Sequence, residues 1–232
     1  GSRTRAALFM QDDWTPIDDD MTLSFVTGVR FDYDTQFGFN VSPSLAVRFD
    51  PHEMVTLRGT FGLGYRAPQF KDLYLLFENV ANGYIVEGNP DLSPETSIGG
   101  TVSATVRATD ALSIDTQLFW HELDNLFDYQ LGASSDLPGV DRYRLVNVAK
   151  ATSRGGTLSV RYEHRYIGLN VSYSYTDVRD NTVDRPIAQR PTHRGTFDVN
   201  PRYKPWGLSL TVRAEVVGDR PFYGDRDGDL VE

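Results

Sequence analysis

The sequence predicts an all-β fold, namely an antiparallel transmembrane β-barrel segment of about ten strands that follow one another as a meander. Three observations carry this prediction: apolar and polar residues alternate, the segments are long, and short turns alternate with mostly longer loops. Successive strand side chains point to opposite faces, so alternation gives one apolar and one polar surface. Residues 22–33 show it clearly: the apolar side carries Leu23, Phe25, Val29, Phe31 and Tyr33.

The strands are expected where this alternation is bounded by clusters of Gly, Pro, Asn and Asp. The long strand that ends near 164 is expected to be bulged around Ser153–Gly156, where two glycines meet. The expected strands cover about 4–14, 22–34, 39–50, 54–65, 97–109, 112–128, 142–164, 167–177, 193–203 and 208–216.

Strand length and loop asymmetry favour a membrane barrel over a soluble sheet. Strands of roughly 11 residues exceed the soluble average of about 5–6 and suit a tilted membrane crossing. The expected short turns (15–21, 50–53, 109–111, 164–166, 204–207) alternate with loops at 66–95, 129–141, 179–191 and beyond 217, and only 35–38 breaks this rule. A soluble β-sandwich could cover its own apolar face, but its strands are usually shorter.

Composition excludes several other classes of protein. The 232 residues carry a formal net charge of −9, which makes nucleic acid an unsuitable partner because phosphate binding needs a basic surface. There are no cysteines, so disulfides and thiolate metal sites are excluded. No stretch approaches the ~18 consecutive apolar residues of a spanning helix. Both ends are interpreted as cut, so the chain is expected to be a piece of a longer protein.

The polar face of the expected sheet is rich in charged residues. A barrel that is too wide to fill its lumen with its own side chains needs water or a plug, and charged walls suit either content. For any single arginine, a hydrated pore wall is the simpler interpretation. The expected lumen-facing charges are Arg30, Arg48, Arg58, Arg107, Arg161, Arg213, Glu163 and Glu215.

Two motifs flank the long loop at 66–95. The first is Tyr65-Arg66-Ala67-Pro68, and the second contains Asn89-Pro90-Asp91-Leu92-Ser93-Pro94-Glu95. Together they resemble the TonB-dependent outer-membrane receptors, in which such elements end one strand and open the next. Asn147, Arg154-Gly155-Gly156 and the stretch from Tyr173 to His193 extend the likeness. The resemblance implies that residues 1–232 are a partial barrel domain: about ten consecutive strands of a 22-stranded barrel, with the plug domain absent.

The resemblance also implies a function. Such receptors sit in the bacterial outer membrane, bind a scarce nutrient such as a ferric siderophore or cobalamin, and import it with energy transmitted through TonB. The implied partners are outer-membrane lipid, a small metal chelate, and the TonB complex, which is contacted through the absent plug segment. A haem receptor of the same family and a passive porin are the alternatives. No nucleophile, base and acid set is apparent, so no enzyme is expected and an outer-membrane hydrolase is a distant rival.

The loop at 66–95 offers candidate ligand-binding residues, namely Tyr74, Phe77, Asn79 and Tyr84. Their aromatic and polar mix suits an organic chelate, although loop packing or an aromatic girdle explains them as well. Haem-type members commonly place a histidine between the two motifs, and residues 66–92 contain none. No histidine pair has metal-ligand spacing, so no metal site is expected.

An acidic run near the end, Asp225-Arg226-Asp227-Gly228-Asp229, superficially suggests Ca²⁺ on an extracellular loop. It lacks the full spacing of an EF-hand, and an acidic turn is the favoured interpretation.

Overall fold

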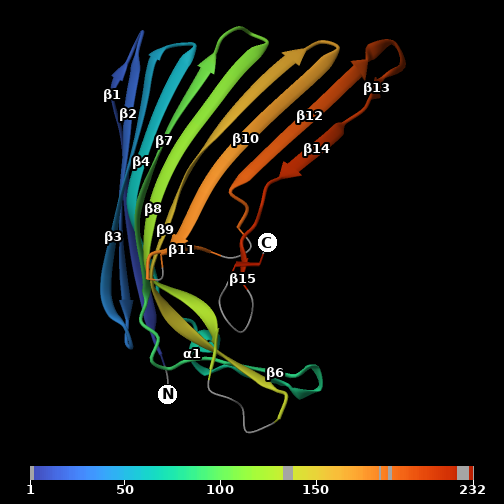
Figure 1. Cartoon of the computed structure of the whole chain (residues 1–232). Helices are drawn as coiled ribbons and strands as arrows, with labels where there is room; N and C mark the ends of the chain where they lie inside the picture. The colour runs from blue at the N-terminus through green and yellow to red at the C-terminus, as the bar shows by residue number, and fades with distance from the viewer. Residues whose placement is uncertain (1–2, 133–137, 183, 188–189, 224–229, 232) are drawn as a thin grey trace.

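Nine long antiparallel strands and several shorter ones form one strongly curved sheet in the computed structural model (Figure 1). The structure describes residues 3–132, 138–182, 184–187, 190–223 and 230–231. The sheet order is β1-β2-β3-β4-β7-β8-β9-β10-β12, with β13 and β14 both paired to β12. Sequential strands are therefore spatial neighbours, as the expected meander requires. In this chain the barrel is not closed.

The strand bounds mostly agree with the alternation pattern. The long strands are β1 (Arg5–Asp18), β2 (Thr22–Asp34), β3 (Gly38–His52), β4 (Val55–Arg66), β7 (Glu95–Arg107), β8 (Leu112–Leu131), β9 (Asp141–His164), β10 (Ile167–Asp180) and β12 (His193–Tyr203). The expected strand at 208–216 is divided into β13 and the six-residue β14 (Val212–Val217). The short elements are α1 (Phe70–Tyr74), β5 (Leu76–Asn79), η1 (Val80–Asn82), β6 (Tyr84–Glu87), β11 (Arg185–Pro186), η2 (Lys204–Trp206), β13 (Leu208–Ser209), β15 (Phe222–Tyr223) and β16 (Leu230–Val231).

Several predicted boundaries are wrong. β1 continues through the expected turn to Asp18, with an irregularity in its pairing between Trp14 and Ile17. The expected loop at 129–141 is shorter, because β8 runs to Leu131 and pairs there with the start of β9. The loop at 66–95 contains α1 and a β5–β6 hairpin. In this hairpin, β6 pairs in parallel with β9. Among the described residues, no helix has the length and hydropathy needed to cross a membrane.

The expected bulge at Ser153–Gly156 is also wrong. The pairing of β9 with β8 and β10 passes through this stretch without a shift, from Ser153 opposite His121 to Gly156 opposite Leu118. A Cβ on Gly155 would lie 2.1 Å from the backbone oxygen of Tyr175. The glycine is therefore required by close approach of the neighbouring strand, and not by an extra residue in the ladder.

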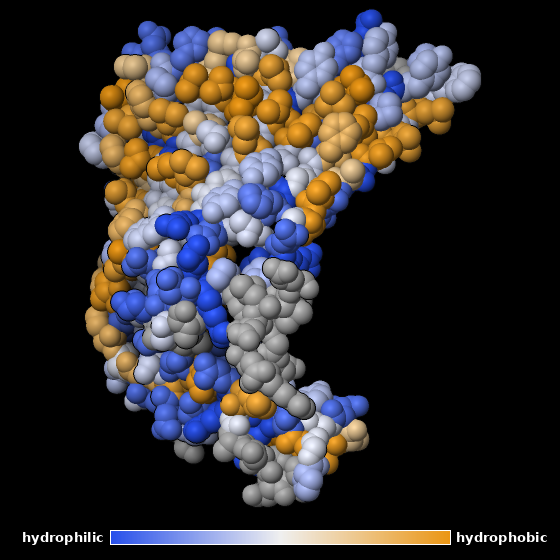
Figure 2. All heavy atoms as spheres, viewed as in Figure 1, coloured by the Kyte–Doolittle hydropathy of each residue, from blue (hydrophilic) through white to orange (hydrophobic). Residues whose placement is uncertain are grey.

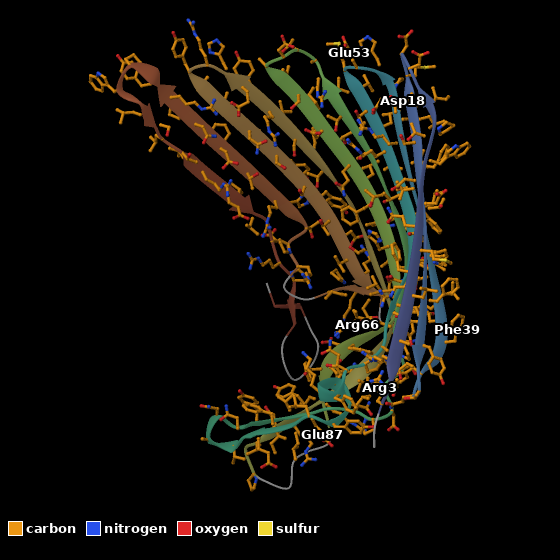
Figure 3. The ribbon with its side chains drawn as sticks, turned by 180° about the vertical axis from the view of Figure 1, so that it is seen from behind. Arg3, Asp18, Phe39, Glu53, Arg66 and Glu87 are labelled. Atoms are coloured by element: carbon orange, nitrogen blue, oxygen red, sulfur yellow. The ribbon has the colours of Figure 1, made fainter. Side chains whose placement is uncertain are left out.

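The strand register separates two faces of the sheet. Apolar side chains in register remain highly exposed on one face; they include Leu8, Met10, Trp14, Phe39, Leu45, Phe61, Val102, Leu118, Leu158, Val171, Phe197 and Val216. Figure 3 shows Phe39 on the outer side of the curved sheet and Arg66 on the inner side. In Figure 2, hydrophobic residues gather towards the end with the short turns, and hydrophilic residues towards the end with the long loops.

Candidate functional site at the loop end of the sheet

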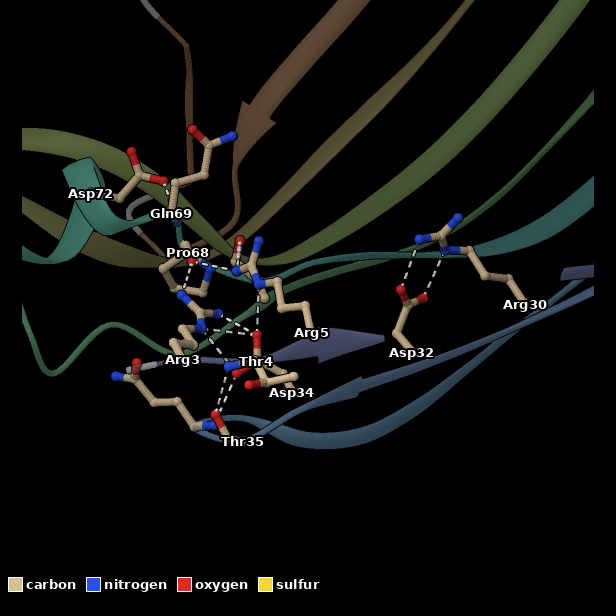
Figure 4. Close-up of polar contacts among 12 residues, drawn as sticks. Arg3, Thr4, Arg5, Arg30, Asp32, Asp34, Thr35, Pro68, Gln69 and Asp72 are labelled. Carbon is tan, nitrogen blue, oxygen red and sulfur yellow. Dashed lines mark hydrogen bonds and ion pairs between the residues drawn. The ribbon is translucent and has the colours of Figure 1, made fainter. Parts of the chain in front are cut away.

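A buried carboxylate organises the loop end of the first strands (Figure 4). Asp34 is the last residue of β2 and is 3% exposed. Arg3 donates to both of its oxygens, Arg5 Nε donates to Oδ2 at 2.7 Å, and the backbone N–H of Gln36 donates to Oδ1. Both guanidinium groups also donate to the carbonyl of Pro68, at 2.7 and 2.6 Å. Arg5 of β1 and Arg3, which precedes that strand, thus hold the start of the long loop.

The electrostatics of Asp34 follow from these contacts. The residue lies past Tyr33 and Phe39, the aromatic residues at the loop end of the apolar face, and so outside the apolar band of β2. The hydrogen bond from Arg3 lowers the pKa of Asp34 far below its usual range, and burial opposes this shift only in part. Asp34 is therefore a fixed anion that binds two cations.

The second loop motif packs against a very short helix. Leu73 of α1 is 1% exposed and packs with Leu92 and Leu145, and Phe37 and Phe127 lie against this small core. The N–H of Asn89 donates to the carbonyl of Asp72 at 2.9 Å. A Cβ on Gly88 would lie 2.8 Å from three backbone atoms of α1, so only glycine permits this approach.

An ion pair joins the two motifs across the start and end of the loop. Arg66 Nη1 donates to Glu95 Oε2 at 2.8 Å, and its guanidinium lies over the Phe127 ring at 5.0 Å. The other Glu95 oxygen accepts the N–H of Phe127 at 2.7 Å. Glu95 is 8% exposed, so this carboxylate is buried and fully paired. The motif residues Arg66, Pro68, Leu92 and Glu95 therefore fasten the loop to the rim.

β9 adds further bonds to the same segment. Asn147 accepts from Ser93 N–H at 2.8 Å and donates to the carbonyls of Ser93 and Asn125. Arg144 donates to Asn89 Oδ1 at 2.9 Å. The family likeness points to Asn147, whereas nothing local in the sequence marks Asp34. The Arg-x-Arg spacing that places Arg3 and Arg5 on one face of the first strand is the only signal that could have found the two arginines.

The structure brings three of the four candidate ligand residues together. Asn79 Nδ2 donates to the Tyr84 hydroxyl at 3.0 Å, and the rings of Phe77 and Tyr84 are 6.2 Å apart in the β5–β6 hairpin. Tyr74 lies apart from them, beside Phe70 on α1. Phe77 and Tyr74 remain 48% and 58% exposed, so both rings are open to a ligand. Figure 1 shows the hairpin and the ends of β8 and β9 reaching across the loop end of the curved sheet.

Two cavities lie near this rim. One, of about 380 Å³, is lined by residues of β1, β2 and β4, including Arg5, Asp32 and Tyr65. Tyr65, which alternation places with the apolar residues, buries its hydroxyl there without a partner among the described residues. The other, of about 910 Å³, is lined by His121, Phe127 and the segment from Arg185 to Ile187, among others. Neither is lined by a candidate ligand residue.

The expected lumen-facing charges differ in their partners. Arg30 pairs with Asp32, Arg48 with Asp50, and Arg213 with Asp198. Glu163 pairs with Arg202 and Glu215 with Arg194. Arg107 and Arg161 line one cavity of about 760 Å³ near the turns, and Arg58 stands directly opposite Arg48. The expected calcium loop, Asp225–Asp229, lies outside the described residues.

Comparison with known proteins decides the family. The family described as "TonB dependent receptor-like, beta-barrel" matches residues 1–231. The chain belongs to this family. The family resemblance and the barrel fold predicted from the sequence are therefore confirmed, and so is the location, because these barrels are bacterial outer-membrane proteins.

Curated relatives of this TonB-dependent receptor barrel include an iron-regulated outer membrane virulence protein of Vibrio cholerae, 29% identical over 204 residues. That alignment covers 83% of this chain and 30% of the relative. The vitamin B12 transporter BtuB of Vibrio vulnificus is 27% identical over 193 residues, which cover 83% of this chain and 28% of that protein. The chain thus spans about a third of the length of such relatives.

Solved structures show the same fold. The ferric enterobactin receptor PfeA of Pseudomonas aeruginosa has a TM-score of 0.74 and 20% identity, and the match covers 99% of this chain and 35% of that one. The siderophore receptor PirA of Acinetobacter baumannii has a TM-score of 0.72 and 18% identity, with coverage of 94% and 34%. The family is one of transport receptors and not of enzymes.

Proposed function

We propose that the protein carrying this chain is an active-transport receptor that imports a scarce nutrient, such as a ferric siderophore or cobalamin, with energy supplied through TonB. The observation that supports this most directly is the fastened loop at the rim. Asp34, Glu95 and the Leu73 core hold residues 66–95 where an extracellular ligand would arrive. A passive porin has no need for an aromatic hairpin held in place over its mouth.

The siderophore or cobalamin alternative is favoured over haem. The reason is that residues 66–92 contain no histidine. The names of the relatives do not separate the alternatives, because they include an iron-regulated outer membrane protein, a vitamin B12 transporter and a hemoglobin-binding protein. The charged inner wall, with Arg30, Arg48 and Arg213 already paired to carboxylates, suits a polar surface that contacts a plug or water. TonB would be contacted through the plug segment.

Growth of a deletion strain tests the transport proposal. We expect deletion to abolish growth on one iron source, or to abolish cobalamin-dependent growth, and the full-length gene to restore it. The same defect in a strain lacking TonB would link uptake to TonB energy. Wild-type growth of the deletion strain on every iron source and on cobalamin would contradict the proposal.

An alanine variant of the β5–β6 hairpin tests whether this hairpin binds the ligand. For the nutrient identified by growth, we expect Phe77→Ala to weaken binding to whole cells about tenfold, because an aromatic contact in a site contributes roughly 1 kcal/mol or more. Phe77 is 48% exposed, so the substitution should leave folding intact. Leu208→Ala, at the turn end, is the control and should bind normally. Unchanged affinity of the Phe77 variant would remove the hairpin from the site.

A further inference from the structure

The outer face of the sheet carries a groove of about 480 Å³ across β3, β4, β7 and β8. The register explains its shape. One row across the four strands reads Val47, Gly59, Val102 and Leu118, and the next reads Phe49, Leu57, Ala104 and Thr116. Small residues at Gly59 and Ala104 therefore form a hollow between larger apolar side chains.

The open space at Gly59 distinguishes it from Gly156 and Gly100, two other glycines of this face. A Cβ on Gly156 would lie 2.7 Å from the Leu118 side chain, and one on Gly100 would meet Thr60 and Phe61. Those two positions are covered by their neighbours. A Cβ on Gly59 would meet no atom within 4 Å. The missing side chain at Gly59 is thus not replaced by any neighbour in the described part of the chain.

The position of the groove limits what can fill it. Phe49, Leu57 and Ala104 lie within a few residues of the short turns that end β3 and β7 and begin β4. The surrounding residues of this face are exposed and apolar, including Leu45 and Phe61. The groove is therefore part of the surface that meets hydrocarbon, in the half of the membrane next to the turns.

We propose that this groove seats one acyl chain of an outer-membrane phospholipid. Water is a poor occupant because it needs two to four polar partners, and the side chains of both rows are apolar except Thr116. An unfilled groove would forfeit the dispersion contacts of its lining. An acyl chain is slim, flexible and apolar, and it is the molecule that this face of the sheet meets in the membrane. This site depends on the membrane location and is independent of the transported nutrient.

Native mass spectrometry of the full-length protein, stripped with mild detergent, tests the site. We expect the wild type to retain one phospholipid that survives delipidation, and Gly59→Phe to lose it because the new ring occupies the groove. Gly195→Phe is the matched control: Gly195 lies on the same face, also has no atom within 4 Å of a Cβ, and does not line the groove. This variant should retain the lipid.

Ala104→Phe closes the groove from a second strand and should also lose the lipid, so a folding defect in one variant does not decide the test. Heat-modifiable gel mobility shows that each variant is folded. Equal lipid retention by wild type and both groove variants would overturn the proposal. So would a dimer that Gly59→Phe dissociates, because protein would then fill the groove.

Discussion

Asp34→Asn is expected to destabilise the full-length protein by about 3 kcal/mol, because it leaves a buried cation without its counter-ion. The Arg3 side chain is only 6% exposed and has no other carboxylate within ion-pair distance among the described residues. The loss should appear as a lower urea midpoint for unfolding in lipid vesicles, followed by gel mobility. Loosened contacts at Pro68 should also make the loop at 66–95 more sensitive to protease.

Asp32→Asn is the matched control, since it makes the same substitution two residues earlier on the same strand. Asp32 pairs with Arg30, whose side chain is 52% exposed, so this ion pair is solvated. Exposed pairs contribute about 1 kcal/mol or less, and the control should change the midpoint little. Equal effects of the two variants would show that Asp34 is not a buried anchor.

The pH dependence of the Asp34 effect has a definite sign. The native pKa of Asp34 lies below its usual value because Arg3 and Arg5 bind the carboxylate. A lowered native pKa gives stability that is complete above the unfolded-state pKa of about 3.9 and fades as the pH falls toward the native value. The gap in stability between wild type and Asp34→Asn should therefore be constant from pH 7 to about pH 5 and narrow in stronger acid. A gap that narrows near neutral pH would contradict this assignment.

The faces of the sheet could be predicted because strand alternation is a local property. Leu23, Phe25 and Phe31 identify the apolar face of β2 within ten residues. The pairing of β2 with β3 can be predicted because only a short turn connects the two strands. The contacts that build the rim are not local. Arg3 reaches Pro68 across 65 positions, and Leu73 packs against Leu145 of β9. No periodicity in either segment carries information about such a partner.

The two loop motifs show a related limit: the sequence identifies their residues but not the contacts that those residues make. The family resemblance singles out Arg66, Pro68, Leu92 and Glu95 from sequence alone, but it does not say what these residues do. The structure gives them a mechanical role: each one bonds or packs to a segment outside its own motif. The helix α1 has no periodic signal because it is only five residues long, and its position depends on the contacts of Leu73.

The two adjacent glycines of β9 predict a bulge from sequence, but in the structure Gly155 allows β10 to approach closely. Replacing Gly155 is therefore expected to have a large effect on stability. Gly155→Ala should destabilise the protein by about 3 kcal/mol or more and lower its abundance in the outer membrane. The reason is that the backbone of a paired strand cannot move away from the added methyl group without disturbing the strand pairing. The added Cβ would lie 2.1 Å from the Tyr175 carbonyl oxygen and 2.8 Å from the Phe119 ring. The ring could rotate away, but the carbonyl belongs to β10, whose pairing with β9 runs without a break from Ile167 to Asp180.

Gly59→Ala is the control for Gly155→Ala, since it adds the same methyl group to another strand glycine of the same sheet. Its Cβ would meet nothing within 4 Å, so stability should change by less than about 1 kcal/mol. Urea midpoints of the two purified variants and their abundance in isolated outer membranes make the comparison. If Gly155→Ala folds as well as Gly59→Ala, then β9 and β10 do not approach as closely as the register places them. The glycine pair would then require another explanation, such as the bulge that its sequence suggests.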